Sequence, residues 1–396
     1  MHTTTRARRA RALTAVGAAA VLALSACSAA APAETTEPTA AETGAPEAPE
    51  TEAPGADLDA ALAELLEPRD EYPVPDSPAG DVASLAGSTV YYVPLTQQAP
   101  QFAVTGVAVT EAFAAVDVEV QICNGNATPT DVSACITQAT QAGASAIITD
   151  AVPYGMAANA LDAAQAAGIP VVQNNNAATP EHPASDTLLY SPDGSAEQVI
   201  AQMQWVASDS DGAGTVLINK AADGASVPVT TAALAEAEAE CPECTVVVNE
   251  VTSANFGLIA PSTSSALLRE PDVEYVLAQY AIHLQPTQGG VEQAGRAADT
   301  KGITGASQLG ALQQLASENF LYAATGQASV FQGWVSADLA MRAVLGSEVP
   351  EYEIPIRLFT RETIGDVNLS PEAEASGEWF GPATFREAFL ANWGAE

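Results

Sequence analysis

The strongest constraint on the fold is the alternation, from residue 88 onward, of short apolar segments with longer segments of helical period. The apolar segments are four to eight residues long and rich in Val and Ile, which is typical of buried strands. Strands that alternate with amphipathic helices predict parallel βαβ units with helices on both faces of a sheet. Because the series starts again near residue 193, the sequence predicts two doubly wound α/β lobes.

The first series has four expected strands, with a helix after each of the first three. The strands are expected at residues 88–94, 116–123, 146–150 and 169–172, and the helices at 102–115, 130–142 and 155–167. The second series opens with a helix and then alternates in the same way. Its helices are expected at 193–207, 229–240, 261–268 and 289–298, and its strands at 214–219, 245–251, 274–278 and 302–307.

The N-terminal residues predict export. Four arginines between Arg6 and Arg11 precede an apolar run of about a dozen residues, which is too short to span a bilayer. This is the layout of a secretory signal peptide, expected over residues 1–26. It ends in Leu-Ser-Ala-Cys, which looks like a bacterial lipobox with Cys27 as the lipidated residue. An ordinary cleavage site with a chance Cys is the alternative, but the order and spacing of the parts favour the lipobox.

Residues 27–83 are expected to link that anchor to the folded lobes. Residues 28–54 are almost entirely Ala, Glu, Thr, Pro and Gly, a composition that favours a disordered tether. A short helix is expected at 57–67, ended by Pro68. No second apolar run is long enough to cross a membrane, so we expect the protein at the outer face of the cytoplasmic membrane, held by lipid alone.

The charge excludes one class of partner. The net charge is −36 at pH 7, and Lys220 and Lys301 are the only lysines. Nucleic acid is therefore not an expected partner, because phosphate neutralisation needs clusters of basic residues.

Four cysteines remain after Cys27, an even number in a chain that is expected to be exported. Their proximity in the sequence favours the pairs Cys123–Cys135 and Cys241–Cys244. The second pair forms a CxxC motif, for which a redox or metal site is the alternative. A redox CxxC usually opens a helix, whereas this one follows a helix and precedes a strand, so a structural disulfide is favoured.

The ordered set of segments resembles the ribose-type periplasmic binding proteins over residues 88–393. The clearest parts are Ala-Gly-Ala-Ser-Ala-Ile-Ile at 142–148 and Ala-Ala-Gly-Ile-Pro-Val-Val at 166–172, and a weaker likeness lies between Phe385 and Trp393. The resemblance implies the type I periplasmic binding protein fold, with two lobes around a central cleft. It also implies delivery of a ligand to an ABC permease, and a monomer.

The same resemblance implies the lobe boundaries. The N-terminal lobe is expected at 84–183 plus about 325–345, and the C-terminal lobe and tail at 184–324 plus about 346–396. Three crossovers between the lobes are expected near 177–186, 322–332 and 344–355, with a helix at 331–345 that returns to the first lobe.

Ligands of such sheets bind beyond the carboxyl ends of the strands, which makes the residues in those loops the candidates. In the first lobe they are Gln98, Phe102, Asp150, Tyr154, Asn174, Asn175 and Asn176. In the second lobe they are Asn219, Asp223, Phe256, Gln279, Tyr280, His283 and Gln308, with Gln327 in a crossover. Asn175 and Asn176 stand where the family usually carries an Asp-Arg pair, so ribose specificity does not transfer directly.

Amides and aromatic rings dominate these loops, which predicts a small neutral polar ligand such as a sugar, a polyol or a nucleoside-like compound.

No enzymatic activity, metal or cofactor is expected, because the loops hold no catalytic or metal-binding spacing. A ligand-sensing receptor that acts through a membrane histidine kinase is the alternative function, since the same fold serves both.

Overall fold

The computed structural model describes residues 56–222, 224 and 227–395. Of the two units into which the chain divides, the second, residues 52–396, holds every described element. The expected signal peptide, Cys27 and the tether up to residue 55 lie outside the described residues. The described helices include none long and apolar enough to cross a membrane.

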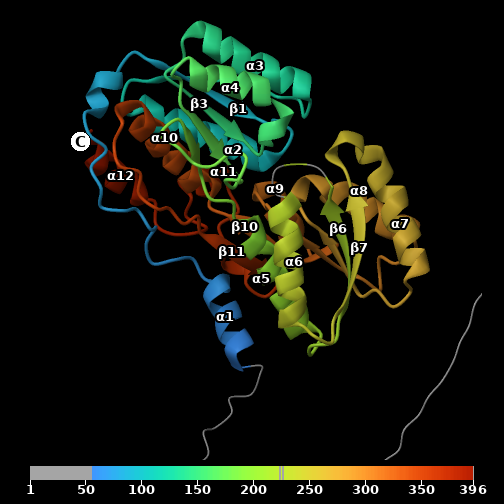
Figure 1. Ribbon diagram of the computed structural model, residues 1–396. Coiled ribbons are helices and arrows are strands. Elements are labelled where there is room, and N and C mark those ends of the chain that lie inside the picture. Colours follow the sequence, from blue (N-terminus) through green and yellow to red (C-terminus); the bar gives the residue numbers. More distant parts are fainter. Residues whose placement is uncertain (1–55, 223, 225–226, 396) are drawn as a thin grey trace, which may run out of the picture. The chain divides into compact units, whose positions relative to one another are not determined.

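The unit contains two separate sheets (Figure 1). The first has the order β2-β1-β3-β4-β5, and all its neighbours are parallel. Its strands are β1 Thr89–Pro94, β2 Glu119–Ile122, β3 Ala146–Asp150, β4 Val171–Asn174 and β5 Leu188–Tyr190. The second has the order β11-β10-β9-β8-β6-β7, in which only the β10–β11 pair is antiparallel. Its strands are β6 Thr215–Ala221, β7 Thr245–Val251, β8 Tyr275–Ala278, β9 Lys301–Thr304, β10 Leu321–Gln327 and β11 Ile356–Thr360.

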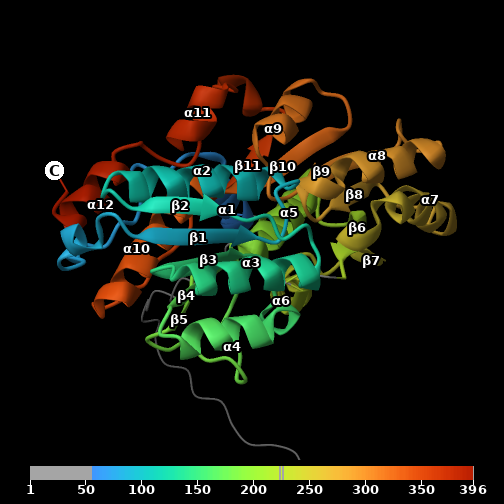
Figure 2. The same cartoon turned by 90° about the horizontal axis from the view of Figure 1, so that it is seen from above.

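Strand periodicity decides which helices cover each face of the first sheet. Alternate residues point to opposite faces, so Tyr92 packs on one side and Tyr91 on the other. The Tyr91 face is covered by α3 and α4, and the Tyr92 face by α2 and α10 (Figures 1 and 2). The helices of this lobe are η1 Val82–Leu85, α2 Pro100–Ala114, α3 Pro129–Ala142, η2 Tyr154–Met156, α4 Ala158–Ala166 and α10 Ser329–Leu345.

The second sheet is also covered on both faces. Its two buried layers include Leu277 and Val276, which are neighbours on β8 and so face opposite sides. The helices on the Leu277 side are α5 Ser195–Asp209 and α6 Val227–Glu240. Those on the Val276 side are η3 Ser253–Leu258, α7 Ile259–Arg269, η4 Ala281–His283, α8 Leu284–Gln293 and α9 Leu309–Ala316.

The lobe boundaries need correction. β5 pairs with β4, so the first sheet extends to Tyr190 and does not end at 183. β10 pairs with β9 as far as Ala324 and with β11 as far as Gln327, so the first segment of the second lobe ends there and not at 324. The chain therefore crosses at 191–194, at Ala328 and at 346–355. The expected helix at 289–298 begins earlier, at Leu284, and the expected helix at 155–167 is divided into η2 and α4.

The chain also passes from one lobe to the other near both ends of the described residues. The expected helix at 57–67 is α1, Ala56–Leu66, and its Leu62 packs in the core of the second lobe with residues of α5 and β11. The tail leaves β11 through η5 Ile364–Asp366 and α11 Pro371–Ser376, and ends in α12 Phe385–Trp393. The expectation that this tail stays with the second lobe is wrong, because Trp393 stacks on Trp334 of α10.

A buried ion pair fixes the crossover helix. Arg342 and Asp338 of α10 are both fully buried, with 2.5 Å between Arg342 Nε and Asp338 Oδ2. Arg342 also donates to the carbonyl oxygens of Ser77 and Glu348. Asp338 accepts from Trp393 Nε1 at 2.8 Å. The pair thereby joins α10 to the N-terminal segment, a crossover and the tail.

Replacement of Arg342 by Met should lower the free energy of unfolding by about 3–5 kcal/mol, because the Asp338 carboxylate would stay buried without its cation. Chemical denaturation measures this loss. The control is Arg69→Met, which removes an exposed ion pair with Glu353 and should cost less than about 1 kcal/mol. Equal losses in the two variants would contradict the assigned role of the buried pair.

Candidate ligand-binding site

A cavity of about 370 Å³ opens between the carboxyl ends of the two sheets. The first lobe lines it with the loop 95–102 after β1, with 126–128 after β2, with Ala151 after β3 and with Asn175 after β4. The second lobe contributes Gly224, Phe256, Tyr280, Ala281, Ile282 and Ala306, and Ser195 follows the first crossover. This is the edge at which doubly wound sheets bind ligands.

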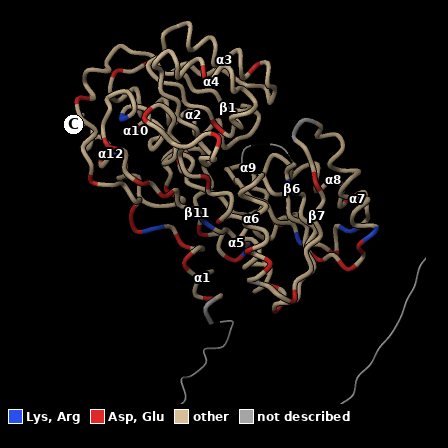
Figure 3. Tube along the Cα trace, viewed as in Figure 1, with Lys and Arg blue, Asp and Glu red and all other residues tan. Residues whose placement is uncertain are grey.

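The described residues that line the cavity are uncharged. None of the described residues that line it is Asp, Glu, Lys, Arg or His, although acidic residues are spread widely over the described chain (Figure 3). The polar groups are amides and hydroxyls, and the aromatic rings are Phe102, Phe256 and Tyr280. The described residues also contain no group of His, Cys, Asp and Glu that could hold a metal ion.

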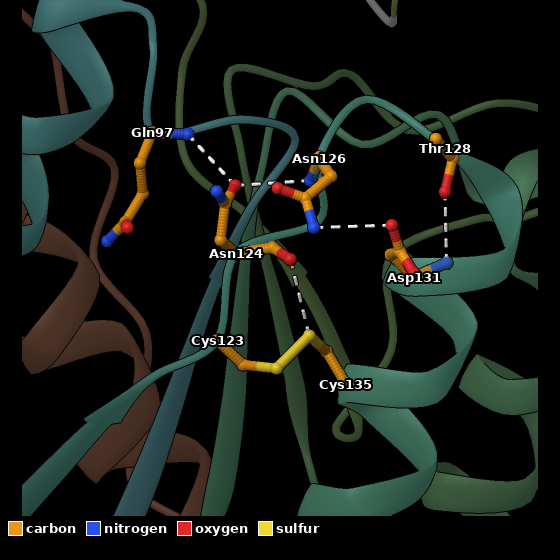
Figure 4. Close-up of a disulfide and its surroundings, with 7 residues drawn as sticks. All are labelled: Gln97, Cys123, Asn124, Asn126, Thr128, Asp131 and Cys135. Atoms are coloured by element: carbon orange, nitrogen blue, oxygen red, sulfur yellow. Dashed lines mark hydrogen bonds between the residues drawn. A yellow bond between two sulfur atoms is a disulfide. The ribbon is translucent and has the colours of Figure 1, made fainter.

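The loop after β2 is held by Asn124 (Figure 4). Its Oδ1 accepts from the backbone N–H groups of Gln97, at 3.0 Å, and of Asn126, at 3.1 Å. Asn126 Nδ2 in turn donates to Asp131 Oδ2 at 3.2 Å. Thr128 caps the helix that follows, since its side chain accepts from the N–H of Asp131 at 3.1 Å. The loops after β1 and β2 therefore form one connected wall of the cavity.

Gly125 is required in this wall. Its N–H donates to Pro94 O at 3.0 Å, and a Cβ atom at this position would lie 2.6 Å from Val132 Cγ2 and 2.8 Å from Pro94 O. Only glycine permits so close an approach of the backbone.

Both expected disulfides are present, Cys123–Cys135 and Cys241–Cys244. The first joins β2 to α3 at the base of the cavity loop (Figure 4). The second joins the end of α6 to β7 at the opposite edge of the second sheet.

Asp150 does not line the cavity, but it holds in place two of the first-lobe segments that do, the start of α2 and the loop after β4. Tyr92 Oη donates to Asp150 Oδ2 at 2.5 Å and lies 3.0 Å from Phe102 O, so it fixes the start of α2. Asn175 Nδ2 donates to Asp150 Oδ1 at 2.7 Å. Burial raises the pKa of Asp150 to about 6, although the hydrogen bonds from Tyr92 and Asn175 oppose this rise.

A buried amide cluster, Asn175, Gln198, Gln327 and Gln332, continues from Asp150 into the crossovers. Gln327 Nε2 and Gln332 Nε2 donate to Asn175 Oδ1 at 2.9 and 3.0 Å. Gln198 Nε2 donates to Gln327 Oε1 at 3.3 Å, and Gln198 Oε1 accepts from the N–H of Ala306 at 2.8 Å. The cluster thus connects cavity residues of both lobes.

The second lobe presents aromatic rings. Buried His283 lies behind Phe256 and Tyr280, with ring centroids 5.8 and 5.9 Å away. Gln279 Nε2 donates to Tyr280 Oη at 2.8 Å. His283 and Gln279 therefore support the rings that line the cavity.

The structure brings five of the sequence-predicted candidates to the cavity: Gln98, Phe102, Asn175, Phe256 and Tyr280. Nine others are described but do not line it: Asp150, Tyr154, Asn174, Asn176, Asn219, Gln279, His283, Gln308 and Gln327. Asp223 lies outside the described residues.

Most of the nine are engaged in internal hydrogen bonds. Tyr154 donates to Asp162, Asn219 donates to Thr263 and Thr287, and Asn176 donates to Val152 O. Gln308 donates to Ser329, and Asn174 accepts from Ser336.

Sequence reasoning missed Thr96, Asn126, Thr128 and Ser195, which line the cavity. The available signal for Asn126 and Thr128 was their place after an expected strand, the same rule that selected the other candidates.

Comparison with known families identifies the chain. Residues 90–348 match the family described as "Periplasmic binding protein domain". The chain belongs to this family. Its members and its structural neighbours are solute-binding proteins of transport systems rather than enzymes, as the sequence predicted. A search of curated protein sequences finds no match to this chain.

Solved structures share the fold of this binding protein. A 5-methylthioribose transporter solute-binding protein from Thermotoga lettingae, in complex with 5-methylthioribose, has a TM-score of 0.66 at 16% identity, covering 78% of this chain and 97% of that chain. A Mycobacterium smegmatis protein in complex with β-D-fucofuranose has a TM-score of 0.63 at 17% identity, covering 74% and 98%. An ABC transporter solute-binding protein from Bacillus halodurans with bound myo-inositol has a TM-score of 0.60 at 18% identity, covering 71% and 97%.

Stability should depend on the protonation of Asp150. Its pKa is raised from 3.8 to about 6, so its stabilising contribution is complete below pH 3.8 and is lost as the pH rises through 6. At 1.36 kcal/mol per pKa unit this amounts to about 2–3 kcal/mol between pH 4 and pH 7. Asp150→Asn should lack this part of the pH dependence when denaturation is measured at both pH values. Identical pH profiles for the two proteins would refute the shift.

Loss of the Cys123–Cys135 disulfide should loosen the cavity loop. In the variant Cys123→Ser/Cys135→Ser, we expect amide hydrogens of residues 124–128 to exchange about tenfold faster or more, because the disulfide constrains this segment. Hydrogen–deuterium exchange measures the rate. Cys241→Ser/Cys244→Ser is the matched control and should leave this peptide unchanged. An equal effect of both variants would indicate general destabilisation instead.

Proposed function

We propose that this protein is the lipid-anchored solute-binding component of an ABC importer, which captures a small neutral polar ligand between its lobes and delivers it to a permease. The observation that carries the proposal is a cavity at the carboxyl ends of the two sheets, whose described lining is uncharged and comes from both lobes. Hinge closure of two lobes around such a ligand is an established way to bury it.

The chemistry of the cavity supports a neutral ligand. Amides offer both donors and acceptors, which suits the hydroxyl groups of a sugar or polyol or the edge of a heterocycle. An anionic ligand would need a fork of donors such as Arg, and no Arg is among the described lining residues. The ligands in the structures of the three neighbours are likewise small polyhydroxy compounds by name.

The N-terminal sequence supports the location. An arginine-rich segment, an apolar run and Cys27 in a lipobox-like sequence together favour export and lipidation. The two disulfides fit an oxidising compartment outside the cytoplasm.

A thermal-shift screen of residues 28–396 tests the proposal. The panel contains neutral sugars, polyols, nucleosides and the three neighbours' ligands, with amino acids and organic acids as the charged comparison. A ligand at one hundred times its dissociation constant should stabilise the fold by about 2.7 kcal/mol. We expect stabilisation by neutral compounds and none by charged ones. Stabilisation by organic acids alone would sink the neutral-ligand assignment, and no stabilisation at all would favour a receptor for a compound outside the panel.

A further inference from the structure

The two walls of the cavity differ in chemistry. The first lobe supplies a wall, here called the polar wall, that holds most of the polar side chains beside the Phe102 ring and other apolar residues. Its polar side chains are those of Thr96, Gln98, Gln101, Asn126, Thr128 and Asn175. The second lobe supplies a wall, here called the apolar wall, whose described residues are Ser195, Gly224, Phe256, Tyr280, Ala281, Ile282 and Ala306. Among the described residues of this wall, only Ser195 and Tyr280 carry a polar group on the side chain.

Two backbone donors of the apolar wall and one buried amide behind it are already used inside the protein. The N–H groups of Ala281 and Ala306 already donate, to Gly305 O at 2.7 Å and to Gln198 Oε1 at 2.8 Å. Behind the wall, Gln279 is used internally, since its Oε1 accepts from Ala221 N and its Nε2 donates to Thr230 and Tyr280. Among the described residues, the second lobe therefore meets a ligand mainly with apolar side chains and with the rings of Phe256 and Tyr280.

A compound with hydroxyl groups on all sides fits these walls poorly. Each hydroxyl pressed against the apolar wall would lose its hydrogen bonds to water without a replacement, which is unfavourable. A compound that is polar at one end and carries a ring at the other would bond to the polar wall and bury the ring against Phe256 and Tyr280.

We infer that the ligand is a neutral amphipathic compound, a sugar joined to an aromatic or other apolar group, as in an aryl glycoside or a nucleoside. The inference rests on the proposed solute-binding function and narrows its ligand class. The sugar hydroxyls face the first lobe, and the apolar group faces the second.

Matched pairs of ligands test this assignment. Calorimetry with residues 28–396 compares the methyl and phenyl glycosides of common pentoses and hexoses, and ribose with adenosine and inosine. Each phenyl glycoside or nucleoside that binds should bind at least about tenfold more tightly than its methyl or free-sugar partner, given the apolar area that a ring buries. Its heat-capacity change on binding should also be more negative.

Two variants distinguish the contributions of the two walls to ligand affinity. Phe256 is only partly buried, so Phe256→Ala should fold normally, as thermal unfolding can verify. It should abolish most of the preference for phenyl over methyl, because the aromatic group loses the ring against which it packs. Gln98→Ala on the polar wall should weaken both members of a pair by the same factor and so preserve their ratio.

The outcomes distinguish the two proposals. Equal affinity for both members of each pair, or a preference that survives Phe256→Ala, would overturn the amphipathic assignment and leave the neutral solute-binding function standing. Binding of charged compounds alone, or of no compound in the series, would overturn the assignment together with the proposed function beneath it.

Discussion

The buried amide cluster is the feature on which both the fold and the cavity depend. Two parallel sheets that meet at their carboxyl ends bring loop backbone and polar side chains into the interior, where each group needs a partner. Asn and Gln can donate and accept at once, so Asn175, Gln327 and Gln332 satisfy one another at the point where the chain passes from β10 to α10. Apolar side chains at these positions would leave the neighbouring donors without partners.

The same cluster couples the cavity to the crossovers. Asn175 lines the cavity, bonds to Asp150 of the first sheet and accepts from Gln327, which lies at the end of a second-sheet strand. Any rotation of one lobe against the other must rearrange these bonds, because the crossover at Ala328 lies directly beside them. The hydrogen-bond pattern around Asn175 therefore depends on both the ligand site and the lobe arrangement.

The sequence predicted the elements whose signals are local. Strands such as Ala146–Asp150 and Val171–Asn174 are apolar runs next to amphipathic helices, and both are present. β5 was missed because three residues give no periodicity. β11 was missed because Arg357 interrupts its apolar run. The structure buries that guanidinium, which donates to Leu66 O and Trp379 O and lies over the Phe359 ring.

The candidate site was predictable to the level of loops but not of side chains. The carboxyl-end rule selected Asp150 and Asn175 alike, yet only Asn175 lines the cavity. The difference lies in long-range partners, since Tyr92 holds Asp150 in the interior and no local pattern encodes that contact. Likewise, Asn219 lies at the expected place, but Thr263 and Thr287 from two helices accept its donors.

Backbone conformation adds a constraint that composition does not reveal. Five of the eight non-glycine residues with positive φ in the described chain line the cavity: Asn126, Ala127, Ala151, Asn175 and Ala306. Such conformations are strained and persist only where surrounding bonds hold them. Here Ala127 N donates to Leu95 O, Ala151 N donates to Asn174 O, and Ala306 N donates to Gln198. The cavity walls are thus held in shape by the protein itself, which reduces the ordering entropy that a ligand must overcome.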